Sequence, residues 1–214
     1  MHELYKNKIF NSVLLITIIG EFLLPFILKH FYRGYDSKTM VMSVLGSPES
    51  PVKIIYNIWL IWLGIFLLLS SFVIFSEIKK TSAALAVMTF ISVSVFAVGA
   101  GVLSGIFSVN ESKDVVTVAS QIHGFGSAIG FMALVFFPLL NGIASIKNKD
   151  IIQGVICVSD FIIALIFFIF FIMGDKEEFK ETIFSYAGLW ERLSLFFMYV
   201  PFLYNAVKNL ITAA

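Results

Sequence analysis

The sequence predicts an all-α fold, a polytopic bundle of six transmembrane helices, and three observations lead to it. Of 214 residues, 59% are hydrophobic and only 14% are charged, whereas a soluble domain is roughly half apolar and a quarter charged. The apolar residues stand in long runs, and a helix of about 20 such residues crosses the roughly 30 Å of a bilayer's hydrocarbon core. Short polar segments separate six runs of this kind.

The N-terminal half of the chain supplies three of these runs. The first covers about residues 9–28 and contains Glu21. The segment 34–52 is rich in Gly, Ser and Pro, which rules out a continuous span and predicts a short interfacial helix and a turn. The second run covers about residues 54–75, and the third, about 83–107, ends in the small residues AVGAGVLSG.

The C-terminal half supplies the other three. An acidic turn at residues 110–114 precedes a fourth run at about 118–146; the fifth covers about 151–173, and the sixth about 183–210. No segment between the runs exceeds about twenty residues, too few for a soluble domain. We therefore expect residues 1–214 to form a single transmembrane domain with both termini on one side.

The orientation in the membrane should follow the excess of Lys and Arg in cytoplasmic loops. Here the loops on the two sides of the membrane carry similar numbers of these residues. The terminal-side set lies in short loops with few acids, whereas the opposite set is spread over longer segments that hold most of the acids. We predict a multi-pass protein of the cell membrane with both termini in the cytoplasm. The terminal-side set is Lys6, Lys8, Lys79, Lys80, Lys147, Lys149 and Lys208; the opposite set is Lys29, Arg33, Lys38, Lys53, Lys113, Lys176 and Lys180.

Several classes of partner are excluded. The net charge is +1 and no basic run exceeds two residues, so the electrostatic footprint of nucleic-acid binding is missing. The single cysteine, Cys157, lies in an apolar run and cannot form an intrachain disulfide or a cysteine-based metal site. We expect no cofactor and no metal; membrane lipids are the expected partners, and the oligomeric state stays open.

Five polar side chains of the apolar runs are predicted to share one leaflet: Glu21, Asn57, His123, Glu191 and Arg192. An ionisable group in hydrocarbon costs roughly 2.5–3.5 kcal/mol, so each calls for a partner or a function. Arg192 is the natural partner of a carboxylate, because its planar guanidinium pairs bidentately and stays charged. The set is either a functional site or an ion pair that fixes helix register.

His123 allows three interpretations: a general base, a metal or haem ligand together with His30, or a hydrogen-bond donor packed among glycines. Asp160, in the fifth run, lies nearer the opposite leaflet and serves as a proton relay, a capping group or a snorkelling side chain.

Two Gly-x-x-x-Gly patterns, at Gly101 and Gly105 and at Gly126 and Gly130, predict close helix contacts. The alternative is that Gly124 and Gly126 clear space beside His123 for a ligand. Aromatic residues near the run ends are predicted to form interfacial belts; they are Trp59, Trp62, Trp190, Tyr56 and Tyr186.

Three short motifs open the segments around the predicted polar set. They are Ser43-x-Leu45-Gly46 followed by Pro51 and Tyr56-Asn57, His123-Gly124, and Gly188-Leu189-x-Glu191-Arg192. In their order and spacing the chain resembles the DUF998 family of bacterial and archaeal membrane proteins, which is biochemically uncharacterised. The resemblance implies six spans and a set of recurring residues in one leaflet that forms one site or one structural knot.

Three functions stay open. The first is binding of a lipid-like ligand in an outer-leaflet polar pocket under the loop 35–51, with ligand contacts from Ser43, Asn57, His123, Glu191 and Arg192. The second is a membrane-embedded hydrolase with His123 as base and Glu191 or Glu21 as acid or ligand. The third is a proton-coupled transporter that uses Glu21 and Asp160.

Overall fold

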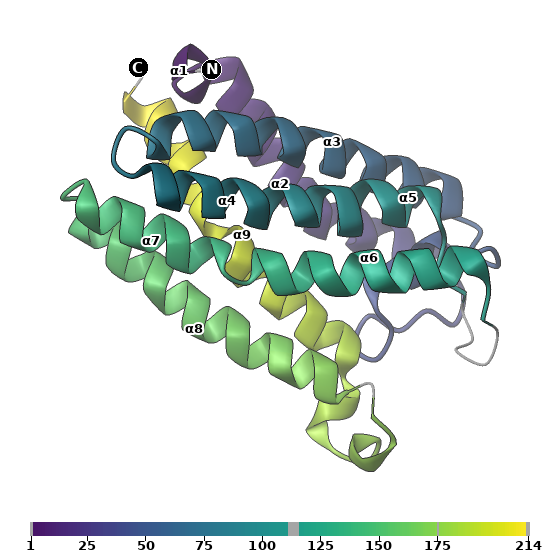
Figure 1. Ribbon diagram of the computed structural model, residues 1–214. Helices are drawn as coiled ribbons and strands as arrows, with labels where there is room; N and C mark the ends of the chain where they lie inside the picture. Colours follow the sequence, from purple (N-terminus) through teal and green to yellow (C-terminus); the bar gives the residue numbers. More distant parts are fainter. Residues whose placement is uncertain (1, 111–115, 175, 213–214) are drawn as a thin grey trace.

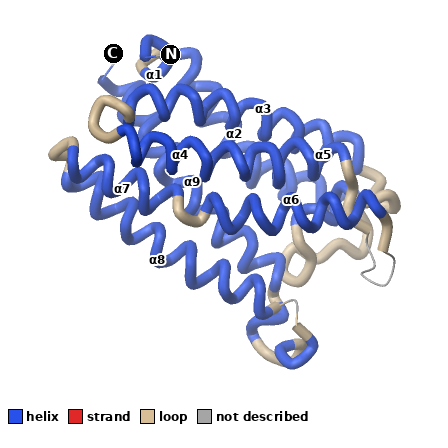
Figure 2. The backbone as a smooth tube through the Cα atoms, viewed as in Figure 1, coloured by secondary structure: helices blue, strands red, loops and turns tan. Residues whose placement is uncertain are grey.

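Helices connected by loops make up residues 2–110, 116–174 and 176–212, which are the residues that this computed structural model describes (Figures 1 and 2). The predicted acidic turn falls mostly on residues 111–115, outside that part. The longer helices are α2 (Lys8–Leu28), α3 (Lys53–Ile78), α4 (Ala83–Phe96), α6 (Val118–Leu134), α7 (Phe137–Lys147), α8 (Ile151–Met173) and α9 (Ala187–Thr212). The shorter ones are α1 (His2–Tyr5), η1 (Lys29–Phe31), η2 (Met42–Gly46), η3 (Ala97–Leu103), α5 (Ser104–Ile106), η4 (Glu177–Phe179) and η5 (Ile183–Ser185).

Five helical stretches are long and apolar enough to cross a membrane. They are Lys8–Phe31, Lys53–Ile78, Ala83–Ile106, Val118–Lys147 and Ile151–Met173. The helix α9 is as long as α3, at 26 residues, but its sequence is more polar. It packs between α2 and α8. Helices thus occupy all six predicted runs, and the all-α membrane bundle is confirmed.

The bundle has two different ends (Figure 1). Both termini and the tight α3–α4 and α7–α8 turns lie at one, which we call the terminal end. The longer connections, between α2 and α3, α5 and α6, and α8 and α9, lie at the other, which we call the loop end. The terminal end carries the terminal lysines, defined as Lys6, Lys8, Lys79, Lys80, Lys147, Lys149 and Lys208, all of them exposed.

Polar residues set where several helices begin. The Asn7 side chain accepts a hydrogen bond from the backbone N–H of Phe10, at 2.9 Å, at the start of α2. Thr117 and Ser120 form a capping box at the start of α6. Such caps satisfy N–H groups that have no partner within the helix, which fixes the first turn.

The fourth run is one span but two helices. It was predicted as a continuous helix, whereas α6 ends at Leu134 and α7 begins at Phe137. The cause is Pro138, which has no N–H and is favoured in a first helical turn but not inside a helix. One carbonyl near the break, that of Ala133, accepts a hydrogen bond from the Ser92 hydroxyl at 2.7 Å.

The third span passes between α3 and α6 at very short range. It includes a π-helical turn at Ala97–Leu103. A Cβ atom on Gly101 would lie 2.5 Å from the Cα of Gly64, and one on Gly99 would lie 2.3 Å from the carbonyl oxygen of Gly126. The predicted close contacts of the glycine patterns are confirmed, while Gly124 faces open space.

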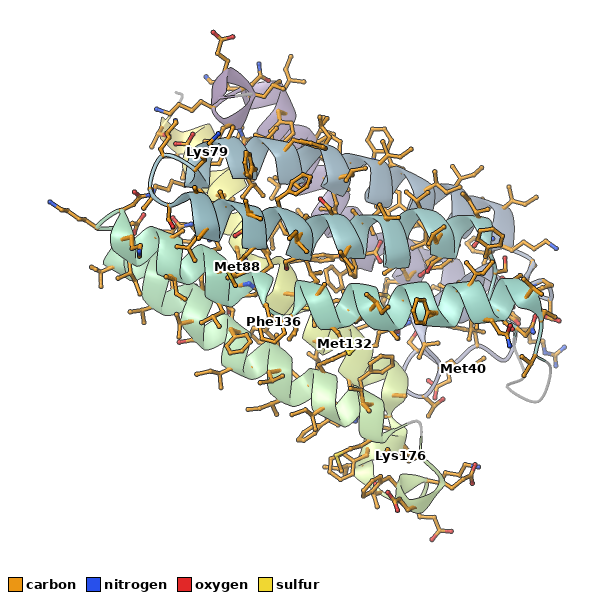
Figure 3. The ribbon with its side chains drawn as sticks, in the orientation of Figure 1. Met40, Lys79, Met88, Met132, Phe136 and Lys176 are labelled. Atoms are coloured by element: carbon orange, nitrogen blue, oxygen red, sulfur yellow. The ribbon has the colours of Figure 1, made fainter. Side chains whose placement is uncertain are left out.

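The outer surface of the bundle is apolar, as a surface in contact with lipid must be. Figure 3 shows Met88, Met132 and Phe136 on the outside of α4, α6 and the α6–α7 break, and each is about half exposed. The charged side chains lie at the ends instead, such as Lys79 at the terminal end and Lys176 at the loop end.

Candidate functional site

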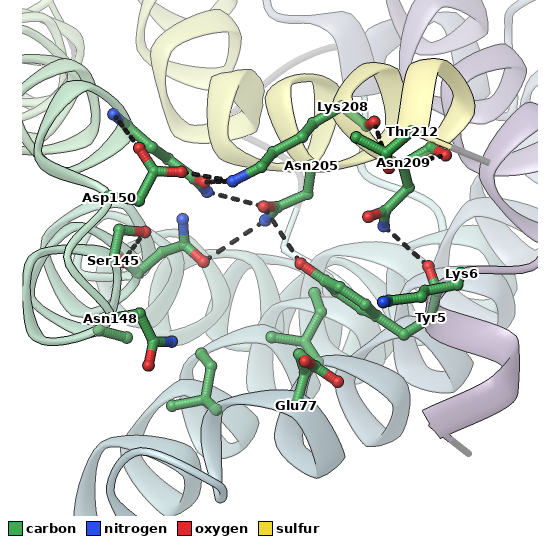
Figure 4. Close-up of a pocket in the computed structure, with 15 residues that line it drawn as sticks. Tyr5, Lys6, Glu77, Ser145, Asn148, Asp150, Asn205, Lys208, Asn209 and Thr212 are labelled. Atoms are coloured by element: carbon green, nitrogen blue, oxygen red, sulfur yellow. Dashed lines mark hydrogen bonds and ion pairs between the residues drawn. The ribbon is translucent and has the colours of Figure 1, made fainter. Parts of the chain in front are cut away.

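A cavity of about 370 Å³ opens at the terminal end of the bundle (Figure 4). Its walls come from α1, α3, α7, α8, α9 and the α7–α8 turn. Five carboxamides line it, Asn141, Asn148, Gln153, Asn205 and Asn209, together with the charged side chains of Lys6, Glu77, Asp150 and Lys208. Ile74, Ile78 and Ala144 supply an apolar wall.

Three buried carboxamides form a directed chain of hydrogen bonds across the cavity. Gln153 Nε2 donates to Asn205 Oδ1 at 2.7 Å, and Asn205 Nδ2 donates to Asn141 Oδ1 at 3.5 Å. Asn141 Nδ2 in turn donates to the sulfur of Cys157 at 3.4 Å. Each amide is at most 6% exposed. Because an unpaired amide in an apolar interior is costly, this chain fixes α7, α8 and α9 relative to one another.

An ion pair stands at the mouth of the cavity. Lys208 Nζ pairs with the Asp150 carboxylate, which also caps the start of α8 by accepting from Gln153 N–H at 3.1 Å. The hydrogen bond from Lys208 is the main cause that holds the pKa of Asp150 below its usual value. The same ammonium group lies 3.5 Å from Gln153 Oε1, so the ion pair continues into the carboxamide chain.

The N-terminal segment closes one side of the cavity. The carbonyl oxygen of Tyr5 accepts hydrogen bonds from Asn11 Nδ2 at 2.8 Å and from Asn209 Nδ2 at 2.7 Å. The Tyr5 hydroxyl donates to Asn205 Oδ1 at 3.4 Å. Burial raises the pKa of Tyr5 to about 12, so this hydroxyl keeps its proton and remains a donor.

At the loop end, Arg192 binds the loop between α2 and α3. Its guanidinium donates to the carbonyl oxygens of Ser37 at 2.9 Å and Met40 at 3.2 Å, and to the Tyr35 hydroxyl at 2.5 Å. It also donates to Gly188 O, one turn back in α9, at 2.6 Å. The predicted pairing of Arg192 with a carboxylate is wrong, because the loop folds over the start of α9 and offers neutral oxygens to the guanidinium.

The rest of the Gly188–Arg192 motif serves the same loop. Glu191 Oε2 accepts from the backbone N–H of Met42 at 2.7 Å, and the N–H of Leu189 donates to Lys38 O at 2.9 Å. A Cβ atom on Gly188 would lie 2.1 Å from the carbonyl oxygen of Met40, so only glycine admits the loop this closely. We call these contacts of Gly188, Leu189, Glu191 and Arg192 the loop clasp.

Glu21 is 2% exposed and accepts a hydrogen bond from the indole N–H of Trp59 at 2.7 Å. Gly20 allows this contact, since a Cβ there would lie 2.4 Å from the Trp59 ring. Tyr56 is also buried, at 2% exposed. Tyr56 therefore lies inside the bundle, and its predicted place in an interfacial belt is wrong, whereas the half-buried Trp59 directs its indole N–H to Glu21.

The other predicted site residues, Asn57, His123 and Ser43, lie at the loop end, where Asn57 and His123 contact the residues that follow the third span. Asn57 Nδ2 donates to Gly46 O at 3.3 Å and to the Ser108 hydroxyl at 3.1 Å. A ring nitrogen of His123, Nδ1, lies 2.9 Å from Phe107 O. Ser43 lies half-buried in η2. Among the described residues, His123 forms no hydrogen bond with Glu21 or Glu191.

Asp160 stands apart from both ends. It is 6% exposed, and its Oδ2 atom has no hydrogen-bond partner among the described residues. We expect the Asp160→Ala variant to unfold at a higher temperature, with a gain of about 1–2 kcal/mol, because it removes a buried carboxyl oxygen that has no hydrogen-bond partner among the described residues. Thermal unfolding in detergent measures this, with the exposed Glu178→Ala as control. A loss of stability would show that the carboxyl holds a stabilising group.

Comparison with known proteins gives one result. The family model of DUF998, a protein of unknown function, matches residues 16–208. No curated protein and no solved structure matches the chain. The matched range covers six helical runs, the loop clasp and most of the carboxamide cavity.

Proposed function

The chain belongs to the DUF998 family, and we propose that this membrane protein binds an amphiphilic, lipid-like ligand whose polar head group enters the cavity at the terminal end. The observation that carries the proposal is the cavity itself, with its buried carboxamides beside an apolar wall. The volume of the cavity lies within the range of about 300–1,000 Å³ that is usual for ligand pockets.

The position of the cavity supports an amphiphile over a fully soluble ligand. Asp150 precedes the first residue of α8, and Lys208 lies in the last turns of α9, so the cavity sits at the level where the helices leave the hydrocarbon. A head group in the cavity would leave its chains beside exposed apolar residues such as Ile146 and Ile151. In this proposal all six helices form one transmembrane domain.

The cavity differs in place from the outer-leaflet pocket predicted under the loop 35–51. That loop is held down by the loop clasp, whose polar groups are engaged with backbone and side-chain atoms of the protein. The carboxamides at the terminal end also bond to one another, but Asn205 Nδ2 makes a single hydrogen bond among the described residues, at 3.5 Å, which leaves one N–H for a head group. The loop-end residues therefore act as structural supports in this proposal.

The Asn205→Leu variant tests the proposal. Asn205 lies at the centre of the carboxamide chain, so its loss should lower the amount of co-purified lipid about tenfold, the equivalent of one or two hydrogen bonds. Native mass spectrometry of the purified protein at low collision energy measures the retained lipid. The matched control is Asn57→Leu at the loop end. Equal retention by the wild type and both variants would contradict the proposal.

A further inference from the structure

We infer that the head group held in the cavity is an anionic phosphate of a membrane phospholipid, collected by the terminal lysines. This inference rests on the proposed function and names the chemical class of its ligand. Its basis is the distribution of charge between the two ends of the bundle.

The terminal end is strongly basic. Its seven lysines face three carboxylates, Glu3, Glu77 and Asp150, which leaves a net charge of +4. The connecting segments at the loop end carry seven basic and eight acidic residues by sequence, a net charge of −1. Each lysine near an anionic bilayer surface strengthens binding to that surface by about 1 kcal/mol, roughly fivefold. The terminal end therefore attracts anionic lipid and the loop end does not.

Several of these lysines have their charge available. Within the described residues, Lys80 pairs with Glu77 and Lys208 pairs with Asp150. Lys6, Lys147 and Lys149 are exposed and have no ion pair or side-chain hydrogen bond there. Lys6 also lines the cavity, together with Lys208 and the carboxylates Glu77 and Asp150. Lys147 and Lys149 flank Asn148, which lines the cavity from the α7–α8 turn.

The cavity adds selectivity to this attraction. A phosphate diester presents a negative charge and several acceptor oxygens, and the hydroxyls of a glycerol head group both donate and accept. Lys6 meets the charge, and the second N–H of Asn205, whose amide nitrogen makes one hydrogen bond at 3.5 Å among the described residues, can donate to an oxygen. In this inference the terminal end faces the anionic cytoplasmic leaflet, the orientation that the sequence predicts.

The test compares two triple variants of the full chain in nanodiscs of phosphatidylcholine with a minor share of phosphatidylglycerol. The first is Lys6→Gln/Lys147→Gln/Lys149→Gln, and the control is Arg33→Gln/Lys38→Gln/Lys176→Gln at the loop end, three equally exposed cations. After extraction, native mass spectrometry reports which lipid remains bound. We expect wild type and control to retain phosphatidylglycerol in roughly tenfold preference over phosphatidylcholine, and the first variant to lose most of that preference.

Other outcomes overturn the inference in distinguishable ways. Equal retention of the two lipids, with Asn205→Leu still emptying the cavity, would refute the phosphate and leave the proposed function standing. Equal loss in both triple variants would show that bulk charge, not the cavity, selects the lipid. A phosphate adduct formed with inorganic phosphate or glycerol phosphate alone, displacing the lipid, would make the ligand a soluble phosphate. No retained lipid in any form would refute both proposals.

Discussion

Replacing Arg192 by alanine is expected to free the loop between α2 and α3 and to lower the free energy of unfolding by about 2–4 kcal/mol. The guanidinium donates to three carbonyl oxygens and to the Tyr35 hydroxyl. Removing it leaves these acceptors without a charged donor at a part-buried site, and desolvated acceptors without a partner are costly. Hydrogen exchange at residues 37–42 and thermal unfolding in detergent measure the two effects.

Two further variants serve as controls for the Arg192→Ala experiment. Arg192→Lys should recover only part of the stability, because an ammonium group cannot span the same set of acceptors as the planar guanidinium. Arg33→Ala removes an exposed arginine of the same end and should change little. If Arg192→Ala leaves hydrogen exchange in the loop unchanged, the loop is held by the other members of the loop clasp and our account of Arg192 fails.

The Gly101→Ala variant is expected to destabilise the bundle by about 1–3 kcal/mol. The new methyl group would lie 2.5 Å from the Cα and 3.0 Å from the backbone nitrogen of Gly64, and backbone atoms cannot rotate out of the way. The third span would have to move away from α3 along its length. Thermal unfolding in detergent measures the loss.

Gly124→Ala is the matched control for that variant. It also places a methyl group on a helical glycine, but nothing lies within 4 Å of the new atom. Alanine is the better helix former by about 1 kcal/mol, so this variant should be neutral or slightly more stable. Equal effects of the two substitutions would show that helix propensity, not the close contact, decides the outcome.

The fold was largely predictable from the sequence because the hydrocarbon of the membrane restricts which backbone structures can form in it. In hydrocarbon every backbone N–H and C=O must be satisfied within the segment, so a long apolar run has to form a helix. The predicted 118–146 run shows the limit of that argument. Length and hydropathy gave one span, whereas Pro138 divides it into α6 and α7.

The contacts of the predicted polar set could not be read from charge alone. Glu21 was expected to need a cation and instead uses the indole N–H of Trp59, which had been assigned to the interface. Arg192 was expected to need a carboxylate and uses loop carbonyls. In both cases the partner depends on how the loop and α3 fold back against the other helices. The spacing of residues along one helix gives no information about that packing.

The carboxamide cavity was missed for a different reason. Asn and Gln are neutral and cost less to insert into a membrane than Asp, Glu, Lys or Arg, so intramembrane charge does not point to them. A usable signal was present nevertheless. Asn7 and Asn11, and Asn205 and Asn209, are each four residues apart, which places each pair on one face of its helix.

The position of α9 has a consequence for biogenesis. This last helix carries both the loop clasp and the partners of Tyr5, contacts that join residues up to 204 positions apart in sequence. Neither end of the bundle can close until α9 has left the ribosome and entered the membrane. A chain truncated before Ala187 should therefore be recognised by membrane proteases as unassembled, even though its five apolar helices are already inserted.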